Sequence, residues 1–227
     1  MTELSRALPL VVILAGTFLA GCASTGPVQT TEWDGLVRQP NARIGAVFVR
    51  PDGQEAIGAF RSVIIDPVSV SFASDFDPGR SSRSLARRLD SDDLLAIKVN
   101  LAAEFQEIFR EELASGGYEV VAQPGPETLQ VSAAIIDLFI TAPDTMTAGR
   151  TRTYTASTGR MTLVLELRDS VTGEILARAV DTRTGRGTGS WNITNRVTNT
   201  ADARRAIRVW ATALREGLDE LYGRSRQ

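Results

Sequence analysis

An apolar run close to the amino terminus decides how much of this chain can contribute to a folded core. Residues 7–20 (ALPLVVILAGTFLA) follow a short polar start, in which the free amine and Arg6 supply positive charge. The run is shorter than the roughly 20 apolar residues that a transmembrane helix needs, and its length fits the core of a secretory signal peptide. We therefore expect residues 1–21 to be removed, so that the remainder of the 227-residue chain builds the fold.

Small residues and a cysteine close this run. Leu19, Ala20 and Gly21 precede Cys22, and together they resemble the lipobox that the lipoprotein signal peptidase recognises. In such substrates the cysteine thiol receives a diacylglycerol, and after cleavage its amine is acylated with a fatty acid such as palmitate. Because two or more acyl chains gain about 0.8 kcal/mol per buried CH₂, they hold a protein on a bilayer almost permanently. The alternative is a buried apolar helix that meets a cysteine by chance. Residue 23 is Ala rather than Asp, which predicts anchoring at the periplasmic face of the outer membrane.

The residue types that the composition lacks exclude several kinds of chemistry. The chain has no His, which removes His general bases, Ser–His and Cys–His catalytic pairs and His metal ligands. Cys22 is its only cysteine, so neither an intramolecular disulfide nor a thiolate metal cluster can form. The net charge of −2 does not favour nucleic acid, because phosphate binding requires a basic excess. We expect no metal or other cofactor and no nucleic-acid partner.

Apolar periodicity predicts two amphipathic helices. In residues 91–115, Ser91 is a candidate N-cap, and apolar side chains recur at steps of three and four residues: Leu94, Ile97, Leu101, Phe105, Ile108 and Phe109. The second helix is expected over residues 201–221, with one apolar face that contains Ile207, Trp210, Leu214 and Leu218.

Apolar and β-branched segments predict strands at residues 44–50, 62–72, 118–122, 129–140, 160–169 and 174–182. Asp66 and Pro67 interrupt the second segment and predict a bend, a bulge or a sheet edge, because Pro cannot donate to a strand ladder. The fourth segment is apolar at almost every position, which is typical of a strand covered on both faces. The last two segments flank a turn and form the clearest hairpin in the chain.

This order of elements predicts the fold class α+β. We expect a two-layer sandwich in which two amphipathic helices cover one face of a mixed or largely antiparallel sheet of four to five strands. The predicted domain organisation is a signal peptide at residues 1–21, a lipidated cysteine with a flexible tether at residues 22–40, and a single periplasmic domain at residues 41–227. Trp33 is expected to mark where the tether docks onto the domain.

Six segments lie in one order along the mature chain: 33–36 (WDGL), 63–68 (VIIDPV), 117–121 (GYEVV), 134–137 (AIID), 166–174 (ELRDSVTGE) and 210–215 (WATALR). As a set they resemble the family of bacterial lipoproteins described as domain of unknown function 3313, over most of the mature chain. The resemblance implies a periplasmic lipoprotein domain. It carries no activity, substrate or site residue over to this chain, and a shared fold does not set a function.

Two carboxylates are candidate buried groups, because Asp66 and Asp137 each lie inside an apolar strand segment. If the sheet brings them together, they are a candidate acid/base pair in which one pKa is raised. The structural alternative is that each carboxylate caps a bulge or binds nearby backbone or Arg groups, and we favour it because no companion nucleophile or metal cluster is visible in the sequence.

Two further features are candidate contact sites. Arg80, Arg83, Arg87 and Arg88 form a basic run that suits lipid headgroups, cell wall or a protein partner, unless it is only a solvated loop. Trp191 lies in a Gly-, Thr- and Asn-rich segment and is either a contact residue or part of the core.

The function that these observations favour is a non-enzymatic interaction or accessory module, anchored in the cell envelope through Cys22. Its partners are expected to be the membrane, through the acyl chains, and a protein or cell-wall component. The first alternative is a carrier or binding protein for a small molecule or lipid, which would use a groove between sheet and helices. The second is a cell-wall hydrolase that uses carboxylates, with Asp66 and Asp137 as its residues.

Overall fold

The sheet is built around one long strand, β7 (Thr128–Phe139). The structure is a computed structural model that describes residues 32–40, 42–78, 89–140, 159–184 and 196–223. On one side, β7 pairs antiparallel with β8 (Arg160–Asp169), and β8 pairs antiparallel with β9 (Ile175–Thr184). The predicted hairpin is confirmed by this β8–β9 pair.

The other edge of β7 is shared by two short parallel strands. Strand β4 (Ser62–Ile65) lies beside its first half and β5 (Ser69–Phe72) beside its second half. The chain leaves the ladder between them at Asp66 and Pro67, which confirms the predicted interruption. Because Pro67 has no N–H to donate, one predicted strand becomes two.

The remaining strands are short and complete both edges of the sheet. Strand β3 (Ala46–Val49) pairs with β9, and β2 (Leu36–Arg38) and β1 (Glu32–Trp33) follow it outward. At the opposite edge, β6 (Glu119–Val120) pairs with β4 in parallel. The order across the sheet is β1-β2-β3-β9-β8-β7-β4-β6, with β5 beside β7.

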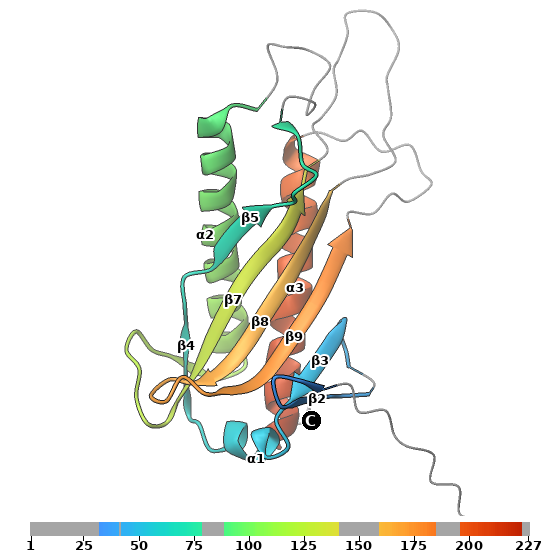
Figure 1. Ribbon diagram of the computed structural model, residues 1–227. Helices are drawn as coiled ribbons and strands as arrows, with labels where there is room; N and C mark the ends of the chain where they lie inside the picture. Colours follow the sequence, from blue (N-terminus) through green and yellow to red (C-terminus); the bar gives the residue numbers. More distant parts are fainter. Residues whose placement is uncertain (1–31, 41, 79–88, 141–158, 185–195, 224–227) are drawn as a thin grey trace, which may run out of the picture.

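Two long helices, α2 (Ser91–Ser115) and α3 (Arg196–Leu221), lie on the same face of this sheet (Figure 1). A third, α1 (Gly53–Gly58), lies at the end of the sheet where α2 and α3 end. Within the described residues, no helix combines the length and the apolar character needed to span a bilayer. We call the sheet face opposite α2 and α3 the open face, because no described helix covers it.

The N-cap of helix α2 lies one residue earlier than the sequence predicted. Asp90, rather than Ser91, is the N-cap, and its carboxylate accepts a hydrogen bond of 2.8 Å from the backbone N–H of Asp93. The Asp93 side chain accepts from the backbone of Asp90 in return, which completes a capping box. A carboxylate at this position also opposes the positive end of the helix dipole.

The core lies between the helices and the sheet. Its most buried members come from every layer and are less than 2% exposed; they include Trp210, Phe105, Phe109, Leu113, Leu129, Ile135, Leu163 and Ile207. Phe105 and Phe109 stack with ring centroids 3.9 Å apart, one turn apart on α2. The apolar stripes predicted for both helices are therefore the surfaces that bury this core.

The α+β class and the mixed sheet are confirmed, whereas the expected strand count is too low. The described residues form nine strands instead of four to five, because strands of two or three residues leave no periodic signal in the sequence. Residues 32–38, placed within the predicted tether, form β1 and β2 and belong to the sheet. Strand β7 is also not covered on both faces, since Gln130, Ser132 and Ile136 are partly exposed on the open face.

Candidate functional site

Asp66 lies at the break between β4 and β5 and forms hydrogen bonds to β7 and α2. Its carboxylate accepts hydrogen bonds from Gln130 Nε2, at 2.7 Å, and from the hydroxyl of Ser132. Its backbone N–H donates to the carbonyl of Val131 at 3.0 Å, and its own carbonyl accepts from the side chain of Gln106 on α2. The half-buried carboxylate is thus bound by two side chains of β7, at the bend between β4 and β5.

Asp137 lies at an irregularity in β7, where the pairing with β8 shifts between Ile136 and Phe139. Its backbone φ of +53° lies in the left-handed region, which Asp tolerates better than most residues. The side chain is exposed rather than buried, because the bulge turns it out of the strand alternation. Val131, beside Asp66, lies six residues earlier, or about 20 Å along the strand. The two carboxylates therefore do not form a pair.

The other predicted site residues lie outside the described part of the chain. These are the lipidation residue Cys22 with Leu19, Ala20 and Gly21, the basic residues Arg80, Arg83, Arg87 and Arg88, and Trp191. The predictions made for them remain predictions.

Sequence reasoning missed an ion cluster on the open face. Arg178 of β9 is only 7% exposed, and it donates to Glu166 Oε1 of β8 at 2.7 Å and to Asp34 Oδ2 at 2.8 Å. Its guanidinium lies 4.2 Å from the ring centroid of Trp33, a cation–π distance. We call Arg178, Glu166, Asp34 and Trp33 the Arg178 cluster. It joins the first hairpin of the domain to the centre of the sheet.

Burial lowers the pKa of Arg178, but the hydrogen bonds to Asp34 and Glu166 outweigh this effect, so the pKa is raised. The guanidinium stays charged, and its charge is matched by two carboxylates. The Asp34-Gly35 pair is a sequence signal that could have located the hairpin that brings Asp34 here, because Asp-Gly is typical of a two-residue hairpin loop. Both residues have positive φ in the structure, as such a loop requires.

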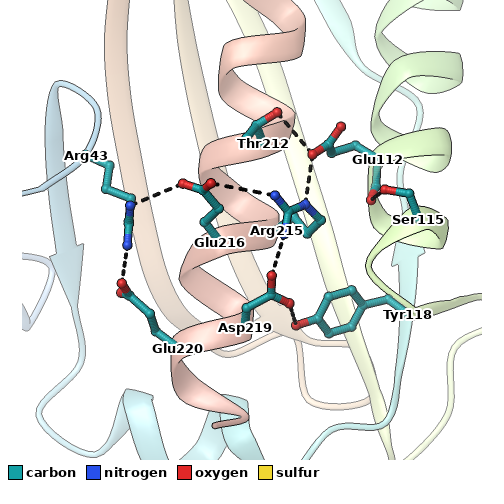
Figure 2. A network of polar contacts seen from close by, with 9 residues as sticks. All are labelled: Arg43, Glu112, Ser115, Tyr118, Thr212, Arg215, Glu216, Asp219 and Glu220. Carbon is teal, nitrogen blue, oxygen red and sulfur yellow. Dashed lines mark hydrogen bonds and ion pairs between the residues drawn. The ribbon is translucent and has the colours of Figure 1, made fainter. Parts of the chain in front are cut away.

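A second polar network joins α3 to α2 (Figure 2). Arg215 of α3 donates to Glu112 Oε1 of α2 at 2.8 Å and to Asp219 Oδ2 at 2.5 Å. Thr212 also donates to Glu112, and the Tyr118 hydroxyl donates to Asp219 at 2.8 Å. The hydrogen bond to Glu112 raises the pKa of Arg215, although burial opposes the shift. The network fixes how the two helices lie against each other.

Arg43, in the segment before β3, extends this network along α3. It donates to Glu216 Oε2 at 3.2 Å and pairs with Glu220 (Figure 2). Arg43 is about half exposed, so water screens these pairs and they contribute little to stability. Their effect is to connect the β3 side of the sheet to the last turns of α3.

One polar contact lies inside the core itself. The indole N–H of Trp210 on α3 donates to Asp181 Oδ2 on β9 at 2.7 Å, and Arg183 pairs with the same oxygen at 2.5 Å. Trp210 is 1% exposed and Asp181 is 7% exposed. A buried carboxylate with two donors is satisfied, so this contact anchors α3 to the sheet.

These arrangements join parts of the fold to one another. The buried or half-buried carboxylates described above are bound by Arg, amide, hydroxyl or indole donors. Within the described residues, no group of three or more Asp, Glu or Cys side chains converges on a point that could hold a metal. Fold and site together define an α+β domain. The charged groups described above connect its strands and helices to one another.

Comparison with known proteins places this domain in a family. The sequence profile described as "Protein of unknown function (DUF3313)" matches residues 29–214, and the chain belongs to that family. This confirms the resemblance drawn from the six segments. No functionally curated protein matches the chain.

Three solved structures show a distant likeness to the fold. The PelC dodecamer from Paraburkholderia phytofirmans is 16% identical, with a TM-score of 0.35 over 69% of this chain and 89% of that chain. The minor lipoprotein from Acinetobacter baumannii is 8% identical, with a TM-score of 0.34 over 73% and 95%. Protein XCC0632 from Xanthomonas campestris is 14% identical, with a TM-score of 0.36 over 72% and 85%. All three TM-scores are low, so none supports a conclusion about this chain.

Proposed function

We propose that this protein is a lipid-anchored component of the cell envelope whose folded domain is a non-enzymatic interaction or accessory module. The proposed anchor is the acylated Cys22, at the periplasmic face of the outer membrane. The apolar run and the small residues before Cys22 support the anchor, and Ala23 supports the choice of membrane.

The observation that carries the non-enzymatic part is the pairing of the charged groups. Arg178, which is nearly buried on the open face, forms ion pairs with Asp34 and Glu166. Arg215 forms ion pairs with Glu112 and Asp219. An acid, base or nucleophile needs a group that is free to exchange a proton or attack a substrate. Groups held in mutual ion pairs instead preserve the shape of a surface, which is what a module that binds a partner requires.

Both alternatives have less support. A carrier with a groove between sheet and helices conflicts with the side chains that fill this layer, such as Phe105, Leu129 and Trp210, which are all at most 1% exposed. A carboxylate hydrolase conflicts with the separation of Asp66 and Asp137, since the paired carboxyl groups of such enzymes lie within about 10 Å of each other.

The anchor is tested in cells with a matched variant. Intact mass of the mature protein is expected to show acyl chains on Cys22, and a Cys22→Ser variant is expected to stay unprocessed and without lipid. An Ala23→Asp variant is expected to move from the outer-membrane to the inner-membrane fraction of a density gradient. A processed, lipidated Cys22→Ser protein would contradict the anchor.

The interaction function is tested by cross-linking in intact cells, followed by capture of the anchored protein. A specific envelope protein or cell-wall fragment is expected, and it is expected to be recovered more weakly with the Cys22→Ser variant. Release of soluble fragments from purified cell wall, lost in both Asp66→Asn and Asp137→Asn, would replace this proposal with the hydrolase.

A further inference from the structure

Two exposed apolar side chains lie towards one end of the sheet. Trp33, in β1, is 41% exposed, and Val171, in the turn between β8 and β9, is 64% exposed. Strand register places Trp33 beside Leu36, one residue past the Val37–Val49 pair and so level with the first residues of β9, next to this turn. Figure 1 shows β2, α1 and the β8–β9 turn at this end, away from the starts of α2 and α3. We call it the turn end.

The ring of Trp33 and the backbone of Val171 are held in place. The Trp33 ring meets Phe48 edge-on, with centroids 5.5 Å apart, and its face lies over Arg178. The backbone N–H of Val171 donates to the Asp169 carboxylate at 2.7 Å, which fixes the turn. Rigid apolar groups lose little conformational entropy when they enter an apolar or interfacial medium. Among the described residues, the indole N–H of Trp33 has no hydrogen-bond partner, so it is free to bind water or a headgroup.

The position of the anchor brings the turn end close to the bilayer. Nine residues lie between Cys22 and the start of β1 at Glu32, and the ten extended residue steps from one to the other span at most about 35 Å. Helix α3, with 26 residues, is itself about 39 Å long. The turn end is therefore within reach of the headgroups, and it is the end of the sheet nearer to the point where the chain enters the domain. A tethered contact also gains a high effective concentration, so a weak surface affinity suffices.

The charges at the turn end are arranged as pairs. Arg50 pairs with both Asp52 and Glu174, and Arg61 lies 3.5 Å from Glu127. A surface of closely alternating charges suits zwitterionic headgroups, which carry a phosphate and an ammonium group, better than it suits anionic lipid. Tryptophan is the side chain that is most typical of such membrane–water interfaces.

We propose that the turn end rests on the zwitterionic phospholipid surface of the membrane that carries the acyl chains, with Trp33 and Val171 in the headgroup layer. This inference rests on the proposed acylation of Cys22. It gives the domain one orientation, in which α2 and α3 begin at the end that faces away from the membrane.

The orientation can be measured on the intact acylated protein. The sulfur of an acylated Cys22 is a thioether, so an introduced cysteine is the only free thiol. Val171→Cys and Leu95→Cys are matched variants, because Val171 and Leu95 are 64% and 62% exposed and lie at opposite ends. Each is labelled with an environment-sensitive dye and reconstituted into phosphatidylcholine–phosphatidylethanolamine vesicles that contain a lipid with a headgroup nitroxide.

Quenching is expected to be several-fold stronger at residue 171 than at residue 95, and to weaken at residue 171 when Trp33 is changed to Ala. Equal quenching at both positions, or stronger quenching at residue 95, overturns the orientation while leaving the anchor intact. Quenching that disappears in high salt overturns the zwitterionic contact in favour of an electrostatic one. Flotation of the vesicles separates the two proposals, because protein that does not float refutes the anchor and the orientation that rests on it.

Discussion

Replacing Trp210 with Phe measures how strongly α3 is fixed to the sheet. The indole N–H donates to the buried carboxylate of Asp181 at 2.7 Å. Removing a hydrogen bond to a charged acceptor costs about 1.5–3 kcal/mol. The ring atoms that Phe lacks cost roughly 1.5 kcal/mol more, at about 0.8 kcal/mol per buried carbon. We therefore expect the free energy of unfolding to fall by about 3–4.5 kcal/mol.

Urea unfolding followed by far-ultraviolet circular dichroism is the suitable assay, because the substitution itself alters tryptophan fluorescence. Trp33→Phe is the matched control. Trp33 is 41% exposed and Phe keeps an aromatic ring beside Arg178, so its cost is expected to be about 0.5–1 kcal/mol. The decisive comparison repeats Trp210→Phe in an Asp181→Ala background, where the hydrogen bond is already absent. There the cost is expected to fall to about 1.5 kcal/mol. An equal cost in both backgrounds would refute the role given to the hydrogen bond.

Three further predictions concern the same fold. Gly45→Ala is expected to lower the melting temperature far more than Gly35→Ala, because a Cβ at Gly45 would lie 2.1 Å from a carbonyl oxygen of β9, whereas nothing lies within 4 Å at Gly35. Backbone hydrogen bonds, first from Thr172, lower the pKa of Asp169 below 3.8, so its stabilising contribution is present above that value and is lost as pH falls through the lower folded pKa. Asp169→Asn should flatten the acid side of a stability–pH curve, and an unchanged curve would contradict this. Arg215→Met is expected to cost about 3 kcal/mol in urea unfolding, because it leaves two half-buried carboxylates without their shared cation; a neutral result would show that the network is dispensable.

Local signals in the sequence predict the long elements well. The apolar stripe of α2 and the alternation in β8 each extend over ten or more residues, so one displaced residue does not hide the period. The break at Asp66 and Pro67 is equally local, since it follows from the missing N–H of Pro67.

The candidate site is less predictable, because its partners come from distant parts of the chain. Arg178 meets Asp34 only after β1, β2 and β3 have been added to the edge of β9. Nothing local to either residue indicates this meeting. Asp66 and Asp137 show the opposite case: both lie in apolar segments, and yet the register of β7 keeps them far apart. A sequence pattern gives residue types, whereas register decides which of them meet.

The pairing of β3 with β9 has a consequence for how the chain acquires its structure. Val49 of β3 pairs with Ala177 of β9, and Ser62 of β4 pairs with Thr128 of β7. In both pairs the two residues are far apart in the sequence. Strands β3 and β4 therefore cannot join the central strands β9 and β7 until most of the chain has been made, and contacts so distant in sequence form slowly. Under the export that we propose, the chain gains from this delay, because its early segments cannot complete the sheet before they have crossed the membrane.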